Sequence, residues 1–166
     1  MPRMQFHRAA TLPAALALAG LAGLTVTGCG DAPPSDTHPQ QLVTKRQAVF
    51  KDFARTLEPL GLVARDRKPY NPSEFMAGTL ELQRLSTLPW AFFTADGNYP
   101  PTRARPEVWQ TPADFRQAQE DFAVRVGELV QAAQGGQLEA VRPAVVAVQD
   151  SCKACHDRFR TTLPGR

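Results

Sequence analysis

Four stretches of this chain carry apolar residues at spacings of three and four, the period that lets a helix bury one face. The stretches cover residues 40–59, 72–88, 112–134 and 138–159. The chain has no Ile and two Tyr, so residues that favour strands are scarce. We therefore expect an all-α domain over residues 40–166. It should fold as an antiparallel four-helix bundle, which builds ligand sites between facing helices.

Proline, glycine and capping residues predict where these helices begin and end. Asn71 followed by Pro72 is a typical helix start, with the Asn side chain as N-cap and the proline at the first helical position. Pro59 and then Gly61 predict the end of the first helix, because a proline cannot donate the helical hydrogen bond. Pro143 lies inside the fourth stretch, where it should bend the helix or delay its start.

The motif Cys-x-x-Cys-His, formed by Cys152, Cys155 and His156, is typical of covalent c-type haem attachment. Two thiols add to the two vinyl groups of one porphyrin, and the adjacent imidazole binds the iron as an axial ligand. On a helix these three positions share one face, as a single flat cofactor requires. The cysteines also continue the apolar stripe of residues 138–159, so the haem should lie against the interior of the bundle.

Three other uses of the two cysteines are less compatible with the sequence. A structural zinc site needs four ligands, and beyond the motif the mature chain offers only the distant His38. A thioredoxin-like redox site would be expected near a βαβ pattern, and no strand pattern precedes this motif. A structural disulfide between Cys152 and Cys155 would give no reason for His156. One haem c per chain is therefore the favoured interpretation.

Arg46 stands out on the inward stripe of the first stretch, because a charge on a buried face needs a partner. A haem propionate would supply one. An arginine can also extend its stem along an apolar surface and keep its guanidinium in solvent. The pattern leaves both options open.

The N-terminus predicts an export signal that is not part of the fold. Arg3 and Arg8 precede an apolar run over residues 9–26, and the sequence Leu-Thr-Val-Thr-Gly-Cys that ends at Cys29 resembles a bacterial lipobox. We expect a lipoprotein signal peptide over residues 1–28 and lipid attachment at Cys29. An ordinary signal peptide with an unmodified cysteine, and an uncleaved anchor, are the alternatives.

The segment 29–39 is polar and proline-rich, so we expect a flexible linker in which His38 is solvated. The protein should then lie at the periplasmic face of a bacterial membrane, held by its lipid, or be soluble in the periplasm if it is not lipidated. Removal of residues 1–28 lowers the net charge from +3 to +1, and no basic stripe suits a nucleic acid.

With these residues in place, the chain resembles the helical cytochrome c′ family over about residues 40–160. The matching segments are Lys-Arg-Gln at 45–47, Leu-Ser-Thr-Leu-Pro-Trp at 85–90, Arg-Pro-Glu-Val-Trp at 105–109 and Ser-Cys-Lys-Ala-Cys-His-Asp-Arg-Phe-Arg at 151–160. A haem motif near the C-terminus of a helical bundle is itself distinctive, because small cytochromes c with one haem usually carry theirs near the N-terminus.

The resemblance implies a role for several residues around the haem. His156 is the proximal ligand of a largely five-coordinate iron. Arg46 and Gln47 contact the propionate region, and Arg103 adds a further contact. Arg160 corresponds to a basic residue close to the proximal face. Members of the family commonly dimerise through their first two helices, which leaves a homodimer open here.

Position 50 determines what the resemblance implies for function. Four residues after the arginine, the family has either an apolar residue that blocks the iron or a methionine that binds it, and this chain has Phe50. We expect an open but crowded sixth position that admits NO and CO and excludes water and larger anions. The alternative is a six-coordinate, low-spin cytochrome that passes electrons to an unidentified redox partner, with Met76 or His38 as the sixth ligand.

An enzyme is not expected, because turnover would call for acid–base groups beside the iron. The stripe that would face the iron offers Val49, Phe50 and Phe53 instead.

Overall fold

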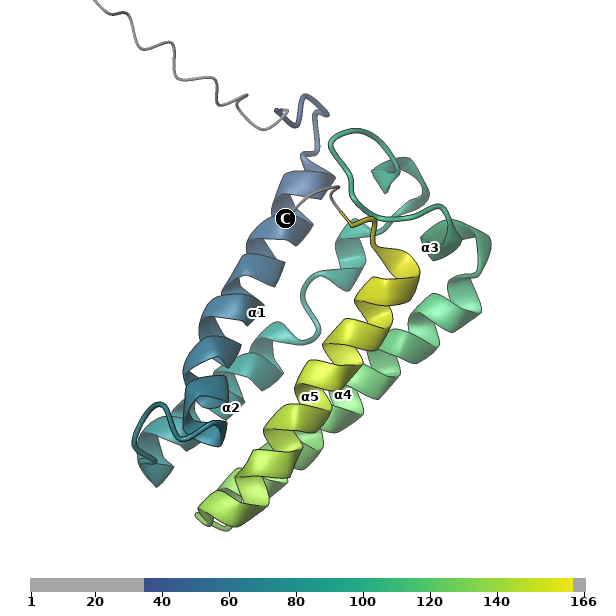
Figure 1. Cartoon of the computed structure of the whole chain (residues 1–166). Helices are drawn as coiled ribbons and strands as arrows, with labels where there is room; N and C mark the ends of the chain where they lie inside the picture. The colour runs from purple at the N-terminus through teal and green to yellow at the C-terminus, as the bar shows by residue number, and fades with distance from the viewer. Residues whose placement is uncertain (1–34, 163–166) are drawn as a thin grey trace, which may run out of the picture. The chain divides into compact units, whose positions relative to one another are not determined.

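The structure of the protein is a computed structural model, which describes residues 35–162. Its long helices are α1 (Leu42–Ala64), α2 (Pro72–Leu85), α4 (Pro112–Gln134) and α5 (Leu138–Phe159), and its short elements are η1 (Trp90–Phe92), η2 (Ala95–Gly97) and α3 (Glu107–Gln110). The long helices alternate in direction, and α1 and α4 each pack against α2 and α5 (Figure 1). The predicted all-α, antiparallel four-helix bundle is therefore confirmed.

Helix α1 continues past Pro59 to Ala64, so the predicted end at Pro59 and Gly61 is wrong. Leu60 and Val63 are buried beyond the proline. Burying an aliphatic side chain contributes about 1.5–3 kcal/mol, which for two residues offsets the about 3 kcal/mol that an interior proline costs. Gly61 serves close packing: a Cβ there would lie 2.9 Å from Gln149 Nε2 on α5.

Helix α2 begins as predicted and ends earlier than predicted. The Asn71 side chain accepts hydrogen bonds from the backbone N–H groups of Ser73 and Glu74, both at 3.1 Å. The helix ends at Leu85 instead of about residue 88. The indole N–H of Trp90 donates to the Ser86 carbonyl at 2.7 Å, which occupies the acceptor that another helical turn would use.

Helix α4 ends before two consecutive glycines, as predicted, and Gly136 takes a left-handed conformation with φ of 65°. Helix α5 begins at Leu138, ahead of Pro143, so the proline does not delay its start. Val141 and Val145 on either side of the proline are fully buried. Their packing holds this turn helical despite the missing hydrogen bond.

The predicted signal peptide and Cys29 lie outside the described residues, whereas the last part of the expected linker contacts the bundle. Asp36 accepts hydrogen bonds from the N–H (2.8 Å) and the hydroxyl (2.9 Å) of Thr44. His38 stacks on Tyr99 with ring centroids 4.4 Å apart, so it is half-buried and not solvated as expected. Among residues 35–162, no helix is long and apolar enough to cross a membrane.

Candidate haem-binding site

The last two turns of α5 carry Cys152, Cys155 and His156 on one continuous helix, as the motif predicts. Cys152 packs against the main core of the bundle. Cys155 packs against a second, smaller cluster of buried residues at the end of the bundle, formed by Val108, Phe115 and Phe159. The two cysteines therefore lie where two apolar regions meet.

Both thiols are half-buried and unpaired. Burial raises the pKa of each thiol to about 11, and the neighbouring Cys155 also raises the pKa of Cys152. Thiols with such values are protonated at neutral pH, which is unlike the lowered pKa of redox-active cysteines. Residues 35–162 contain no cluster of three or more His, Cys, Asp or Glu residues able to hold a metal ion.

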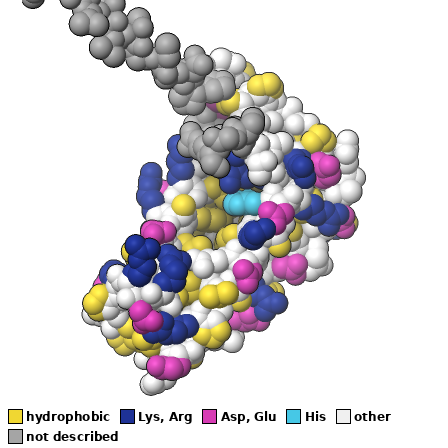
Figure 2. Space-filling model, in the orientation of Figure 1, with side chains coloured by type: hydrophobic (Ala, Val, Ile, Leu, Met, Phe, Trp, Pro, Cys, Tyr) yellow, Lys and Arg dark blue, Asp and Glu magenta, His cyan; other side chains and the backbone are white. Residues whose placement is uncertain are grey.

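His156 is exposed beside these cysteines. Neighbouring protein atoms nevertheless remove part of its hydration, which lowers its pKa, and the positive charges of Arg160 and Arg103 lower it further against the opposing effect of Asp157. A neutral imidazole has a free nitrogen lone pair, which is what an iron ligand needs. Figure 2 shows a histidine side chain at the edge of a hollow whose floor is lined by hydrophobic side chains.

The long connection between α2 and α4, residues 86–111, binds the C-terminal end of α5. Ala104 and Arg160 form an antiparallel bridge, in which the Arg105 N–H donates to the Phe159 carbonyl at 2.9 Å. The Arg105 guanidinium also donates to the carbonyls of Asp157 and Arg158, at 3.3 and 3.4 Å. Arg105 thus caps the haem-binding helix, a role that sequence reasoning missed because its partners lie more than fifty residues away.

Arg103 has a donor that fits a haem propionate. Its Nη2 donates to the Thr161 carbonyl at 2.9 Å, but its buried Nε finds no hydrogen-bond acceptor among the described residues. A buried donor without an acceptor is costly, and a carboxylate is its natural partner. Arg160 lies near Arg103. Burial lowers the pKa of Arg160, and the positive charge of Arg103 lowers it further. An apolar seat at the cysteines with cationic groups beside it matches a porphyrin with propionate arms.

Arg46 does not reach solvent, since only 3% of it is exposed. Its guanidinium donates to the Phe92 carbonyl at 3.1 Å and to the Thr102 hydroxyl, and it lies 4.5 Å from the centroid of the Phe93 ring. Burial lowers the pKa of Arg46, although an arginine remains charged at neutral pH. Its partners in this structure are thus residues of the long connection. Gln47 is half-buried next to it on α1.

Phe50 is half-buried on α1 and lies among other aromatic rings. Its ring centroid is 5.5 Å from that of Phe53, 5.9 Å from that of Trp90 and 6.3 Å from that of Phe93, all in edge-to-face arrangements. Edge-to-face pairs of this kind add to the stability that burial alone provides. The residue that should guard the iron is therefore in contact with three other aromatic rings.

The two alternative sixth ligands have other contacts. Met76 packs against the main core, and its sulfur accepts a hydrogen bond from the Thr79 hydroxyl at 3.6 Å. His38 is stacked on Tyr99. Neither contact involves Phe50 or the cysteines.

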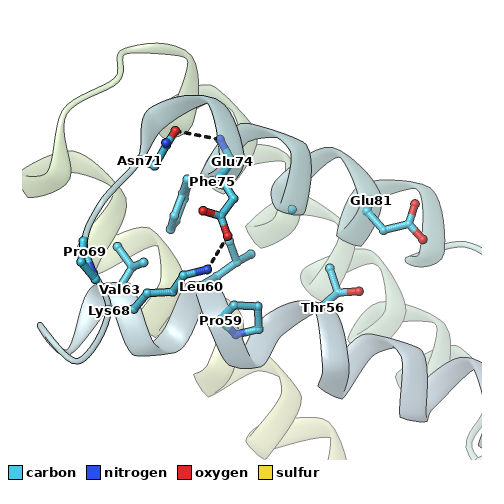
Figure 3. A pocket seen from close by; sticks show the side chains of 11 residues that line it. Thr56, Pro59, Leu60, Val63, Lys68, Pro69, Asn71, Glu74, Phe75 and Glu81 are labelled. Carbon is cyan, nitrogen blue, oxygen red and sulfur yellow. Dashed lines mark hydrogen bonds and ion pairs between the residues drawn. The ribbon is translucent and has the colours of Figure 1, made fainter.

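Two other depressions are poor seats for a porphyrin. The cavity of about 290 Å³ in Figure 3 lies between α1 and α2, and the Lys68–Glu74 ion pair crosses its wall. It is lined by no cysteine or histidine. A groove of about 650 Å³ between α4 and α5 borders Cys155, but it also carries three Asp side chains, Asp114, Asp121 and Asp150. Their charges make this groove unsuited to an apolar ring.

Comparisons of the sequence and of the structure with known proteins point to the same family. The sequence profile of the family described as cytochrome c′ matches residues 41–160. A cytochrome c′ from Alcaligenes xylosoxydans xylosoxydans is 36% identical over 125 residues, which cover 74% of this chain and 94% of that protein.

Two similar solved structures are variants of the cytochrome c prime from Alcaligenes xylosoxidans, one as a nitric oxide complex and one with carbon monoxide bound. The first is 33% identical with a TM-score of 0.72 and covers 78% of this chain and all of that one. The second is 34% identical with a TM-score of 0.72 and covers 77% of this chain and all of that one.

Proposed function

Because the chain belongs to the cytochrome c′ family and therefore carries one covalently bound c-type haem, we propose that it binds small uncharged diatomic gases, NO and CO above all. The relatives of known structure that bind NO and CO share this fold along their whole length. The haem iron supplies the centre at which such a gas binds. The residues of this chain hold the haem, orient it and control access to it.

Cys152 and Cys155 form the two thioether links, and His156 is the proximal ligand. The apolar surroundings of the thiols support this assignment, as does the lowered pKa of His156, which keeps its imidazole neutral. Arg103 offers its unpaired Nε to a propionate, and Arg160 lies close to the proximal face.

Arg46 and Gln47 act at the propionate side of the haem from α1. Arg46 already binds the long connection through both Nη atoms. Any contact with a propionate is therefore made from a side chain that is fixed in advance, and little conformational entropy is lost when the contact forms.

The single observation that carries the proposal is the environment of Phe50. A phenyl ring cannot bind iron, and its neighbours Phe53, Trp90 and Phe93 are aromatic. Such a wall favours an uncharged diatomic over water or an anion, because burying a charge or an unpaired polar group in apolar surroundings is costly. The iron is then largely five-coordinate and high-spin. The same wall offers no group for acid–base chemistry, which supports binding without substrate turnover.

The absorption spectrum of the ferrous protein, recorded with and without CO, tests the proposal. A high-spin spectrum that shifts on addition of CO supports gas binding. A low-spin spectrum that CO leaves unchanged contradicts it and favours the alternative, an electron-transfer cytochrome with Met76 or His38 as sixth ligand. Electron exchange with a redox partner is compatible with a five-coordinate haem and is kept as a secondary role.

We place the protein at the periplasmic face of a bacterial membrane, on the strength of the lipobox-like sequence that ends at Cys29. Several acyl chains on one cysteine would hold it there firmly. Replacement of Cys29 by Ser should move the protein from the membrane fraction to the soluble fraction, with its haem retained. Equal partition of the variant and the parent protein would contradict the lipid anchor.

A further inference from the structure

Phe93 connects the two parts of the haem surroundings. Its ring centroid lies 6.3 Å from that of Phe50 on α1 and 5.0 Å from that of Phe115, which belongs to the cluster beside Cys155. The Arg46 guanidinium lies 4.5 Å from the centroid of the same ring. A phenyl ring in contact with a buried cation gains a favourable interaction that solvent does not weaken.

Arg46 also binds the connection before and after Phe93 in the sequence. It donates to the Phe92 carbonyl, just before Phe93, and to the Thr102 hydroxyl further along the connection. Gly97 leaves room for it, because a Cβ there would lie 3.1 Å from Arg46 Nη1. No carboxylate within residues 35–162 forms an ion pair with Arg46. The side-chain hydrogen bonds that Arg46 makes within residues 35–162 therefore all go to the connection that carries Phe93.

The three rings around Phe50 are not equally free to move. Phe53 is 8% exposed and stacks on Phe122 in the main core, with centroids 5.4 Å apart. Trp90 is fixed by the hydrogen bond from its indole to the Ser86 carbonyl. Phe93 is half-buried and follows the short helix η1; its ring contacts other rings and the Arg46 guanidinium and is not among the side chains packed against the main core. When Phe50 moves aside for a ligand, Phe93 is the neighbour that can give way.

We infer that Phe93 is a second gate residue on the way of a ligand to the iron. Its contact with Arg46 determines how easily Phe93 is displaced. Phe50 covers the iron, whereas Phe93 determines how readily Phe50 can leave it. The rate at which a diatomic ligand enters is then controlled from the long connection as well as from α1. The inference rests on the proposed function, because it concerns the entry of a ligand to the haem.

The rate of CO association with the ferrous holoprotein tests the gate, with Phe93→Leu as the variant and Phe92→Leu as its matched control. Phe92 is half-buried one residue away, and its ring makes no aromatic contact within residues 35–162. Its carbonyl, which Arg46 uses, is unaffected by the substitution. We expect Phe93→Leu to bind CO about tenfold faster than the parent protein, which corresponds to an activation free energy lower by about 1.4 kcal/mol. The association rate of Phe92→Leu should stay within about twofold of the parent rate.

Equal rates for Phe93→Leu and Phe92→Leu, in a parent protein that does bind CO, overturn the gate and leave the proposed function standing. A parent protein that binds no CO overturns both. Should Phe93→Leu fail to fold, Phe93→Ile likewise removes the aromatic ring, brings no group that can bind iron, and must show the same acceleration.

A second measurement isolates Arg46 and does not depend on gas binding. The urea midpoint of the holoprotein is measured for Arg46→Lys, for Phe93→Leu and for the double variant. Lysine keeps the charge but cannot reproduce the planar contact of a guanidinium with the ring. If Arg46 stabilises Phe93 through their contact, the midpoint shift of the double variant is smaller than the sum of the two single shifts. A shift equal to that sum overturns the coupling.

Discussion

The two ends of the bundle are built from different side chains. At the end where short turns join α1 to α2 and α4 to α5, the core is mainly aliphatic apart from Phe75, which packs on Tyr70, and Leu129, Val141 and Val145 are fully buried (Figure 1). At the opposite end, where α5 terminates, the interior is aromatic and several of its rings are only half-buried. A long irregular connection and the buried Arg46 complete that end.

The difference separates stability from function within one fold. The mainly aliphatic end contributes buried apolar packing, and its cavity of about 290 Å³ between α1 and α2 is lined by no cysteine that could attach a haem. The aromatic end instead offers flat rings beside Cys155, the buried and unpaired Nε of Arg103, and a connection that Arg46 binds from α1. Substitutions at the two ends should therefore have separable effects, on unfolding at one end and on the haem at the other.

The largest effect should come from the haem end. Replacing Cys152 and Cys155 together by Ala removes both thioether bonds, so no haem should stay attached to the polypeptide. Electrophoresis under denaturing conditions followed by haem staining measures this directly, with Cys29→Ser as a control that keeps its stain. A stained band for the double variant would show that the attachment site lies elsewhere.

A large effect on stability should come from the aliphatic end. Leu129 is fully buried on α4, so Leu129→Ala should lower the free energy of unfolding by about 2–5 kcal/mol through lost burial and a residual cavity. Urea denaturation of the holoprotein measures it. The exposed Leu80, replaced by Ala, should change stability by no more than about 0.5 kcal/mol. A changed rate of CO association in Leu129→Ala would contradict the separation of the two ends.

A smaller effect should come from the start of α2. Asn71→Ala removes the side-chain oxygen that accepts from the Ser73 and Glu74 N–H groups, which should cost about 1 kcal/mol of stability. Asn71→Asp keeps an acceptor and should restore most of it. Both variants should retain the haem spectrum of the parent protein. A spectral change would mean that the two ends are coupled through α2.

Sequence reasoning succeeded where the cause of a feature is local. The Asn71 cap depends on residues two and three positions away, and the helix that carries Cys152, Cys155 and His156 follows from apolar spacings of three and four. Helix boundaries that depend on distant partners were missed. Helix α1 outruns Pro59 because Leu60 and Val63 are buried, and α2 stops early because Trp90 binds the Ser86 carbonyl.

The same distinction holds for the candidate site. Position 50 could be singled out from the family pattern, but the ring of Phe93 and the capping by Arg105 could not. Arg46 was expected at a propionate or in solvent, and its contacts with Phe92 and Thr102 join residues about fifty positions apart. Such contacts form only when the connection folds back on α1, and no periodicity in the sequence encodes that return.

The central claim is that a held Phe50 leaves the iron without a sixth protein ligand. The spin state of the iron in the parent protein and in Phe50→Met, measured by electronic absorption and resonance Raman spectroscopy, tests it most directly. The account predicts a high-spin, five-coordinate haem in the parent protein and a shift towards low-spin, six-coordinate iron in Phe50→Met. A parent protein that is already low-spin, or a variant with an unchanged spectrum, would contradict it.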